Sequence, residues 1–189
     1  MNDSRQLSHV TKGYLCRFHN ILDEMIRGMT AAERTNSLSH DFIVQMIPHH
    51  RAAIEMSESL LQITTCVPLQ RIAQGIVAEQ TKSIADMQSA LPHCTPLTNS
   101  EQDLCLYEKR FRQITQTMFS QMRNACPDNN VNVDFMREMI PHHQGAIRMS
   151  KNALHYPICQ ELVPILQAII TSQEKGVRQM QALLQSLVH

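Results

Sequence analysis

The chain has 189 residues, and its 17 basic and 17 acidic side chains give a formal net charge of zero. The sequence has no basic stripe for nucleic acid, and no apolar run approaches the roughly 20 residues that cross a bilayer. Only 5 glycines and a low aromatic content, with no Trp, 3 Tyr and 5 Phe, favour helices over sheets. We therefore expect an all-α protein that neither binds nucleic acid nor inserts into a membrane.

Three helices are predicted in the first half of the chain. The first carries an apolar stripe at helical spacing over residues 14–29, and the segment TAAERTNSLSH interrupts it. The second begins near Asp41, and its period places the adjacent His49 and His50 on the broad buried side. The third opens at Pro68, a favoured first-turn position.

The second half of the chain repeats the first. The segment MIPHHRAAIEMS, which begins at Met46, recurs as MIPHHQGAIRMS at Met139, and a shift of 93 positions makes 11 of 17 residues identical around it. The segment LPHCTPLTNSE joins the two copies. The duplication predicts repeats of three helices each, over residues 7–95 and 96–188, which pack together as one bundle of about six helices.

A proline precedes each histidine pair. Inside a helix, Pro48 and Pro141 would each remove one backbone hydrogen bond and kink the axis, at a cost of about 3 kcal/mol or more. One interpretation is that the kink opens room for a ligand and aims the imidazoles. The other is that the helix simply begins at the proline. The sequence leaves both open.

Residues far apart in the sequence are expected to meet at the histidine pairs. Short loops make neighbouring helices antiparallel, so counting outward from each loop matches their heights. This count places each histidine pair near methionines of the first helix and a glutamine of the third, which predicts one pocket in each copy. The candidate metal ligands are His49, His50, Met46, Met25, His142, His143, Met139 and Met118. The candidate supporting or peripheral residues are Gln80, Gln173, Met29, Met122, Met87, Met180, Met56 and Met149.

The combination of side chains indicates which ion would bind. Thioether sulfur and neutral imidazole suit a soft ion of low charge, above all Cu(I). Zinc sites usually combine Cys, His and carboxylates. Ferritin-like iron centres need Glu-x-x-His pairs, whereas Glu138 lies four residues before His142 and its counterpart is Gln45. We therefore expect copper, Cu(I) before Cu(II), with iron and zinc less suited.

Each feature also has an ordinary structural interpretation. A buried histidine is more often a hydrogen-bonded core residue than a ligand, and methionine at helical spacing is more often core packing. Gln80 and Gln173 would then satisfy backbone groups or support the histidines. The repetition favours the metal interpretation, because two adjacent buried histidines leave up to four ring nitrogens per copy in need of partners.

The six cysteines permit three disulfides in an oxidising compartment. Only Cys66 and Cys159 occupy equivalent positions in the two copies. Cys94 and Cys105 flank the segment between the copies and are the first pair to test for a disulfide.

The pattern Asp-Phe-x-x-x-Met-Ile-Pro-His-His-x-x-Ala-Ile-x-Met, followed by Ile-x-x-x-Gln and a later Met, resembles the family known as domain of unknown function 305. The resemblance covers both copies, from about Tyr14 to Leu184. It implies a ferritin-like helical bundle, a secreted or periplasmic protein, and a link to copper binding and tolerance. The chain departs from the family at Ser83 and Gly176, where the family often has a Glu three residues after the third-helix Gln.

The leading hypothesis is a non-enzymatic protein that sequesters or delivers copper through these His/Met sites. The alternative is a structural or interaction module whose buried histidines form a hydrogen-bond network without metal, and a ferritin-like oxidoreductase is the weakest hypothesis. The expected partner is the metal ion, and a second copper-handling protein and a homodimer stay open. The resemblance favours a periplasmic or secreted location, although the N-terminal MNDSRQLSHV does not read as a signal peptide, which leaves a cytoplasmic location as the alternative.

Overall fold

A computed structural model describes residues 6–188, and these residues form six α-helices without a strand. In chain order the helices are α1 (His9–Ala31), α2 (Leu38–Leu61), α3 (Val67–Cys94), α4 (Glu101–Arg123), α5 (Val131–Ala153) and α6 (Leu162–Val188). The all-α prediction is confirmed, with three helices in each copy. Within the described residues, no helix has the length and apolar character needed to cross a membrane.

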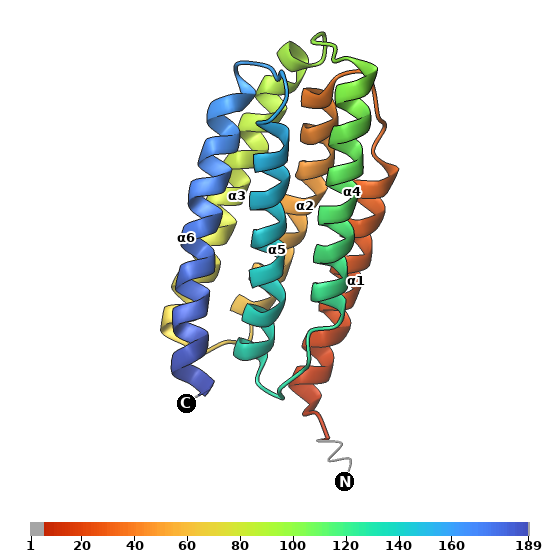
Figure 1. Ribbon diagram of the computed structural model, residues 1–189. Coiled ribbons are helices and arrows are strands. Elements are labelled where there is room, and N and C mark those ends of the chain that lie inside the picture. Colours follow the sequence, from red (N-terminus) through yellow and green to blue (C-terminus); the bar gives the residue numbers. More distant parts are fainter. Residues whose placement is uncertain (1–5, 189) are drawn as a thin grey trace.

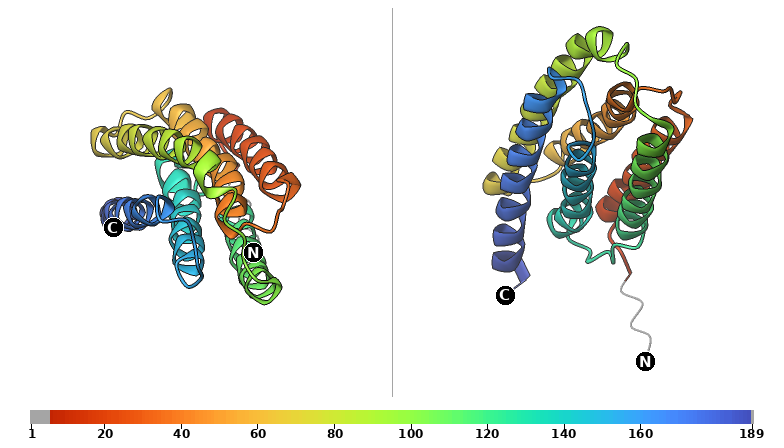
Figure 2. Two further views of the ribbon diagram at one scale, coloured as in Figure 1. Left: turned by 90° about the horizontal axis from the view of Figure 1, so that it is seen from above. Right: turned by 45° about the horizontal axis from the view of Figure 1, so that its top comes forward.

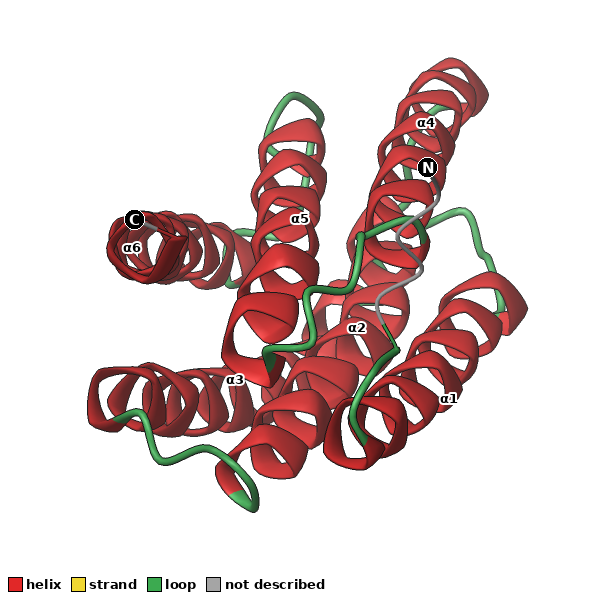
Figure 3. Ribbon diagram, turned by 90° about the horizontal axis from the view of Figure 1, so that it is seen from below, coloured by secondary structure: helices red, strands yellow, loops and turns green. Residues whose placement is uncertain are grey.

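The six helices pack so that each helix of the first copy contacts its counterpart in the second. Figure 1 shows α2 and α5 in the middle, with α3 and α6 on one side and α1 and α4 on the other. The same arrangement is visible along the helix axes, where α2 and α5 again separate the two outer pairs (Figure 3). Because α2 and α5 contact each other as well as the outer helices, their histidine-bearing faces lie at the centre of the protein.

Polar caps set the helix ends. The Ser37 side chain accepts a hydrogen bond from the backbone N–H of His40, so α2 begins at Leu38, three residues before the predicted start at Asp41. Ser100 caps α4 in the same way by accepting from the backbone N–H of Asp103. These caps satisfy backbone donors that the first turn of a helix leaves unpaired.

The two prolines that precede the histidine pairs lie within continuous helices. Pro48 is inside α2 and Pro141 is inside α5, so the interpretation in which the helix begins at the proline is wrong. At Pro48 the neighbouring helix α1 makes room with Gly28, where an added Cβ would lie 2.8 Å from the Cβ of the proline. A side chain at position 28 would therefore push α1 away from α2.

The expected Cys94–Cys105 pair does not form. Cys94, at the end of α3, is bonded instead to Cys159 in the segment before α6, with their Cα atoms 5.2 Å apart. The linker and the first turn of α4 carry Cys105 to an exposed position, where it is a free thiol. The end of α3 and the segment that leads into α6 lie together at one end of the bundle (Figure 2), so the disulfide joins the two copies.

Candidate metal centre

The four motif histidines form one buried cluster at the contact between α2 and α5. His49 and His142 stack with their ring centroids 3.7 Å apart and an angle of 26° between the rings. His50 lies 5.8 Å from His49, and His143 lies 5.9 Å from His142, between ring centroids. None of the four side chains is more than 2% exposed. We call these four residues the histidine cluster.

The cluster differs from the sequence prediction in one respect. One pocket was expected in each copy, but the stacked rings of His49 and His142 bring the histidines of both copies together. The reason is that α2 and α5 pack counterpart against counterpart, with their histidine-bearing faces toward each other. Residues 93 positions apart therefore meet in one place.

Most ring nitrogens of the histidine cluster have no hydrogen-bond partner. His142 donates from Nε2 to the backbone carbonyl of His49 at 3.2 Å, and His50 Nε2 lies 3.1 Å from Ser83 Oγ. Among residues 6–188, both ring nitrogens of His49 and the Nδ1 atoms of the other three rings have no partner at hydrogen-bond geometry. His49 and His143 have only weaker contacts, with the backbone of His142 and of Met139. Buried polar atoms in proteins are nearly always paired, so this group of unpaired nitrogens indicates space for a ligand that binds them.

Burial keeps the cluster uncharged. It lowers the pKa of His50 to about 3 and the pKa of His142 to about 4. Burial also holds the pKa of His49 and of His143 well below the usual value, and positive charge on His142 would lower both further. The rings are therefore neutral at physiological pH, which is the form of histidine that binds a metal.

Buried methionines lie on the helices that carry the cluster and on the helices packed against them. Met46 and Met139 each lie one helical turn before a histidine pair, on the same face of α2 and α5. Met118, on α4, packs its sulfur against Gly145, one turn after His142, at a place where a Cβ would be only 2.1 Å from that sulfur. Its counterpart on α1, Met25, lies one turn before the contact of Gly28 with α2. The four methionines predicted as ligands are 1% or 2% exposed, so each of these thioethers is removed from water.

The third helix of each copy approaches its histidine pair at a position that the sequence analysis did not assign to the site. Ser83 of α3 contacts His50, and Gly176 of α6 lies against His143. The predicted peripheral residues of these helices lie one turn to either side of the contacts: Gln80, Met87, Gln173 and Met180. All four are buried, and both side-chain polar atoms of Gln80 lack a partner. Spacing is the sequence signal that could have assigned Ser83 and Gly176 to the site. Each follows the glutamine of its helix by three residues and therefore lies on the same helix face.

The other predicted peripheral methionines are also buried: Met29, Met56, Met122 and Met149. They belong to the hydrophobic core of the same helices.

The donor set defines the chemistry that the site can support. Within residues 6–188, no three side chains of His, Cys, Asp or Glu are placed to hold one metal ion. A hard ion or a zinc ion would need such a set. The imidazoles and thioethers fit a soft ion of low coordination number. Two histidine nitrogens would bind such an ion, and methionine sulfur would complete its coordination.

The carboxylate next to the cluster belongs to a different contact. The Tyr14 O–H donates to Glu138 Oε2 at 2.6 Å, in a buried contact between α1 and α5. Burial raises the pKa of Glu138 to about 8, and the charge on Asp134 adds to this effect, while the Tyr14 hydrogen bond opposes it. Glu138 is therefore largely protonated at neutral pH and is a poor ligand for a metal ion.

Comparison with known proteins places the chain in a family. The model described as domain of unknown function (DUF305) matches residues 20–91 and residues 39–184. The chain belongs to the DUF305 family. The two matches together span both copies of the duplicated unit, as expected for a DUF305 protein with tandem copies.

Solved structures show the same fold as this DUF305 protein. CopM in an Ag-bound form, prepared by soaking, is 26% identical, covers 82% of this chain and 98% of its own, and has a TM-score of 0.59. CopM in a Cu(II)-bound form is 25% identical, covers 79% of this chain and 97% of its own, and has a TM-score of 0.59. A DUF305 fragment from Deinococcus radiodurans is 20% identical over 79% of this chain and 96% of its own, with a TM-score of 0.58. No curated protein matches the chain.

Proposed function

We propose that this protein binds copper, as Cu(I), at the histidine cluster, and that it sequesters or delivers the ion without catalysing a reaction. The observation that carries the proposal is the convergence of four buried, neutral imidazoles with five unpaired ring nitrogens. Leaving so many buried polar atoms unpaired costs stability in the absence of a ligand. A Cu(I) ion bound by two of these histidines together with methionine sulfur would give partners to part of this group.

The methionines support Cu(I) over other ions. The predicted ligands are the histidine cluster together with four methionines, all of them buried: Met25, Met46, Met118 and Met139. Met46 and Met139 precede the histidine pairs by one helical turn, and Met118 contacts Gly145. Thioether ligands favour Cu(I), and neutral imidazole accepts it. CopM, which has a similar fold, is known in Ag-bound and Cu(II)-bound forms, and Ag(I) is chemically similar to Cu(I).

The alternative of a metal-free hydrogen-bond network is less well supported. A network that fixed the cluster would pair the ring nitrogens with protein groups. Two hydrogen bonds of ordinary geometry involve the side chains of the cluster, one from His142 to the backbone of His49 and one between His50 and Ser83. The rings of His49 and His143 make only weaker contacts, with the backbone of His142 and of Met139.

A periplasmic or secreted location fits the disulfide between Cys94 and Cys159, because such bonds persist in oxidising compartments. In such a compartment the ion would reach the protein from a copper-handling donor or pass to an acceptor. Association of two chains into a homodimer stays a prediction.

A competition titration tests the proposal. Cu(I), kept reduced by ascorbate under anaerobic conditions, is titrated into the protein against a chromophoric chelator. We expect the protein to take Cu(I) from the chelator, and the variant with all four cluster histidines changed to Ala to lose this ability. The matched control changes four exposed histidines to Ala: His9, His19, His93 and His155. Binding that is unchanged in the cluster variant, or lost equally in the control, refutes the assignment.

A further inference from the structure

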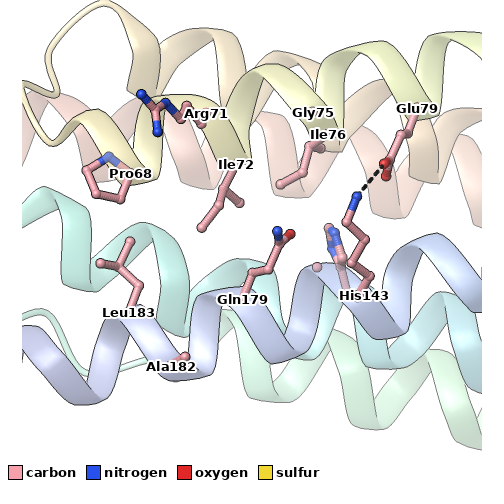
Figure 4. Close-up of a pocket in the computed structure, with 12 residues that line it drawn as sticks. Pro68, Arg71, Ile72, Gly75, Ile76, Glu79, His143, Gln179, Ala182 and Leu183 are labelled. Atoms are coloured by element: carbon pink, nitrogen blue, oxygen red, sulfur yellow. Dashed lines mark ion pairs between the residues drawn. The ribbon is translucent and has the colours of Figure 1, made fainter.

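The outer helices α3 and α6 enclose a cavity of about 510 Å³ that reaches the histidine cluster. Pro68 and Leu183 line one end, and His143 lines the other. Figure 4 shows the His143 side chain pointing from α5 into the gap between α3 and α6. None of the other three cluster histidines lines this cavity.

A difference between the two copies opens His143 to the cavity. In the first copy, Ser83 Oγ lies 3.1 Å from His50 Nε2, so this ring nitrogen already has a partner. The counterpart of Ser83 in the second copy is Gly176, which lies directly against the ring of His143: a Cβ there would be 3.0 Å from Nε2 and 2.9 Å from Cδ2. Glycine thus leaves the Nε2 edge of His143 beside the cavity without a hydroxyl group to bind it.

Charged groups lie near His143 at this end of the cavity. The side chain of His143 is only 2% exposed, and its ring also contacts the backbone of Met139. At the same end of the cavity, Glu79 and Lys175 form an ion pair of 3.7 Å (Figure 4). The opposite charges of Glu79 and Lys175 offset each other beside His143. Arg71, which also lines the cavity, adds a positive charge toward the end near Pro68.

We propose that the cavity between α3 and α6 is the route by which the metal ion reaches the histidine cluster, with His143 as the first ligand that it meets. This proposal rests on the proposed function. On this proposal the two copies differ in function. The second copy receives the ion through His143, whereas His50 of the first copy contacts Ser83 and does not line the cavity. Gly176 is a positioning residue, since its missing side chain allows the ring of His143 to face the cavity.

The structure offers a way to block the route without touching the cluster. Gly75 lines the cavity from α3, and a Cβ at this position would meet no atom within 4 Å. Gly75→Phe therefore projects a ring into open space, and Gly75→Leu is a smaller block. Gly13→Phe is the matched control, because Gly13 is an exposed helical glycine on α1 where a Cβ also meets nothing within 4 Å.

The first experiment uses the metal-free protein and does not depend on metal binding. Diethylpyrocarbonate, which modifies accessible neutral imidazoles, is applied to the folded protein, and each histidine is followed by peptide mass spectrometry. We expect His143 to react several-fold faster than His50, and Gly75→Phe or Gly75→Leu to slow His143 while Gly13→Phe does not. Equal reactivity of His143 and His50, or no effect of either Gly75 variant, overturns the proposed route.

The second experiment measures the binding of Ag(I), supplied as its nitrate in chloride-free buffer, by stopped flow. We expect a several-fold slower association in the Gly75 variants, with an unchanged equilibrium affinity. Association at the wild-type rate overturns the route even when the affinity is high. Absence of Ag(I) and Cu(I) binding in the wild-type protein instead overturns the proposed function, while the modification rates still report whether the cavity leads to His143.

Discussion

Replacing Glu138 by Gln should stabilise the protein at neutral pH. In the folded protein the carboxyl group keeps its proton up to a pKa of about 8, whereas the unfolded chain loses it near 4.5. Ionisation therefore favours the unfolded chain at any pH above 4.5, and folding stability falls as the pH rises toward 8. At pH 7 the difference spans about 2.5 pH units, which corresponds to about 3 kcal/mol. Gln cannot ionise, and it keeps an oxygen that can accept the Tyr14 hydrogen bond.

Urea unfolding of the wild-type and Glu138→Gln proteins at pH 4.5 and pH 7 measures this effect. We expect nearly equal stability at pH 4.5 and a gain of about 3 kcal/mol at pH 7, equivalent to roughly 6–12 °C in Tm for a chain of this size. Glu58→Gln, at an exposed position of α2, serves as the control. A gain that is the same at both pH values would refute the reasoning, since it could not come from ionisation. The affinity for Ag(I) should stay unchanged, because Glu138 is not among the proposed ligands.

Three further predictions concern the cluster, the symmetry and the packing. In a Glu138→Gln background, the metal-free protein should lose stability as the pH falls below 6.5. Burial lowers the pKa of His50 to about 3 and of His142 to about 4, so each contributes a loss of about 1.4 kcal/mol per pH unit until the pH reaches its folded pKa. Burial lowers the pKa of His49 and His143 as well, which adds to the loss. Stability that does not change with pH in urea unfolding would contradict the burial of neutral histidines. In the duplicated unit, Leu187 and Cys66 occupy the positions equivalent to Cys94 and Cys159. Leu187→Cys should therefore form a second disulfide with Cys66, which is detected as the loss of two free thiols. Persistence of both thiols would argue against the paired arrangement of α3 and α6. Gly28→Ala should destabilise the protein by about 1–3 kcal/mol, because the added methyl group would press against α2. Gly13→Ala, at an exposed position, should stabilise the protein by about 0.5–1 kcal/mol. Thermal unfolding compares the two variants, and shifts of both Tm values in the same direction would contradict this prediction.

The helices and the burial of the histidines could be predicted because both follow from the periodic spacing of apolar residues along each segment. The stripe over residues 14–29 and the two-sided apolar face around His49 determine which sides of α1 and α2 turn inward. The duplication then predicts the second copy without further information. Arg51 and Glu55 lie on the exposed side of α2.

The contacts between the copies could not be predicted in the same way. Each copy has several apolar faces, and no local pattern states that α2 should meet α5 through the histidines. The periodicity of each copy therefore predicts two pockets where the structure has one cluster. The same limit explains the disulfide: Cys94 and Cys105 are close in sequence, but the partner of Cys94 is set by the packing of α3 against α6. Ser83 and Gly176 were noticed only as departures from a family pattern, because their role depends on which ring each one faces.

The stacking of His49 on His142 pairs a position with its own duplicate. An ancestral chain with a single copy could have made this contact only between two identical subunits. Every substitution would then have changed both subunits of the pair at once. Fusion of the subunits into one gene product removes that restriction. Gene duplication thus explains how the two sides of a symmetric centre can differ. Ser83 contacts the ring of His50 on one side, and Gly176 leaves the ring of His143 beside the cavity on the other.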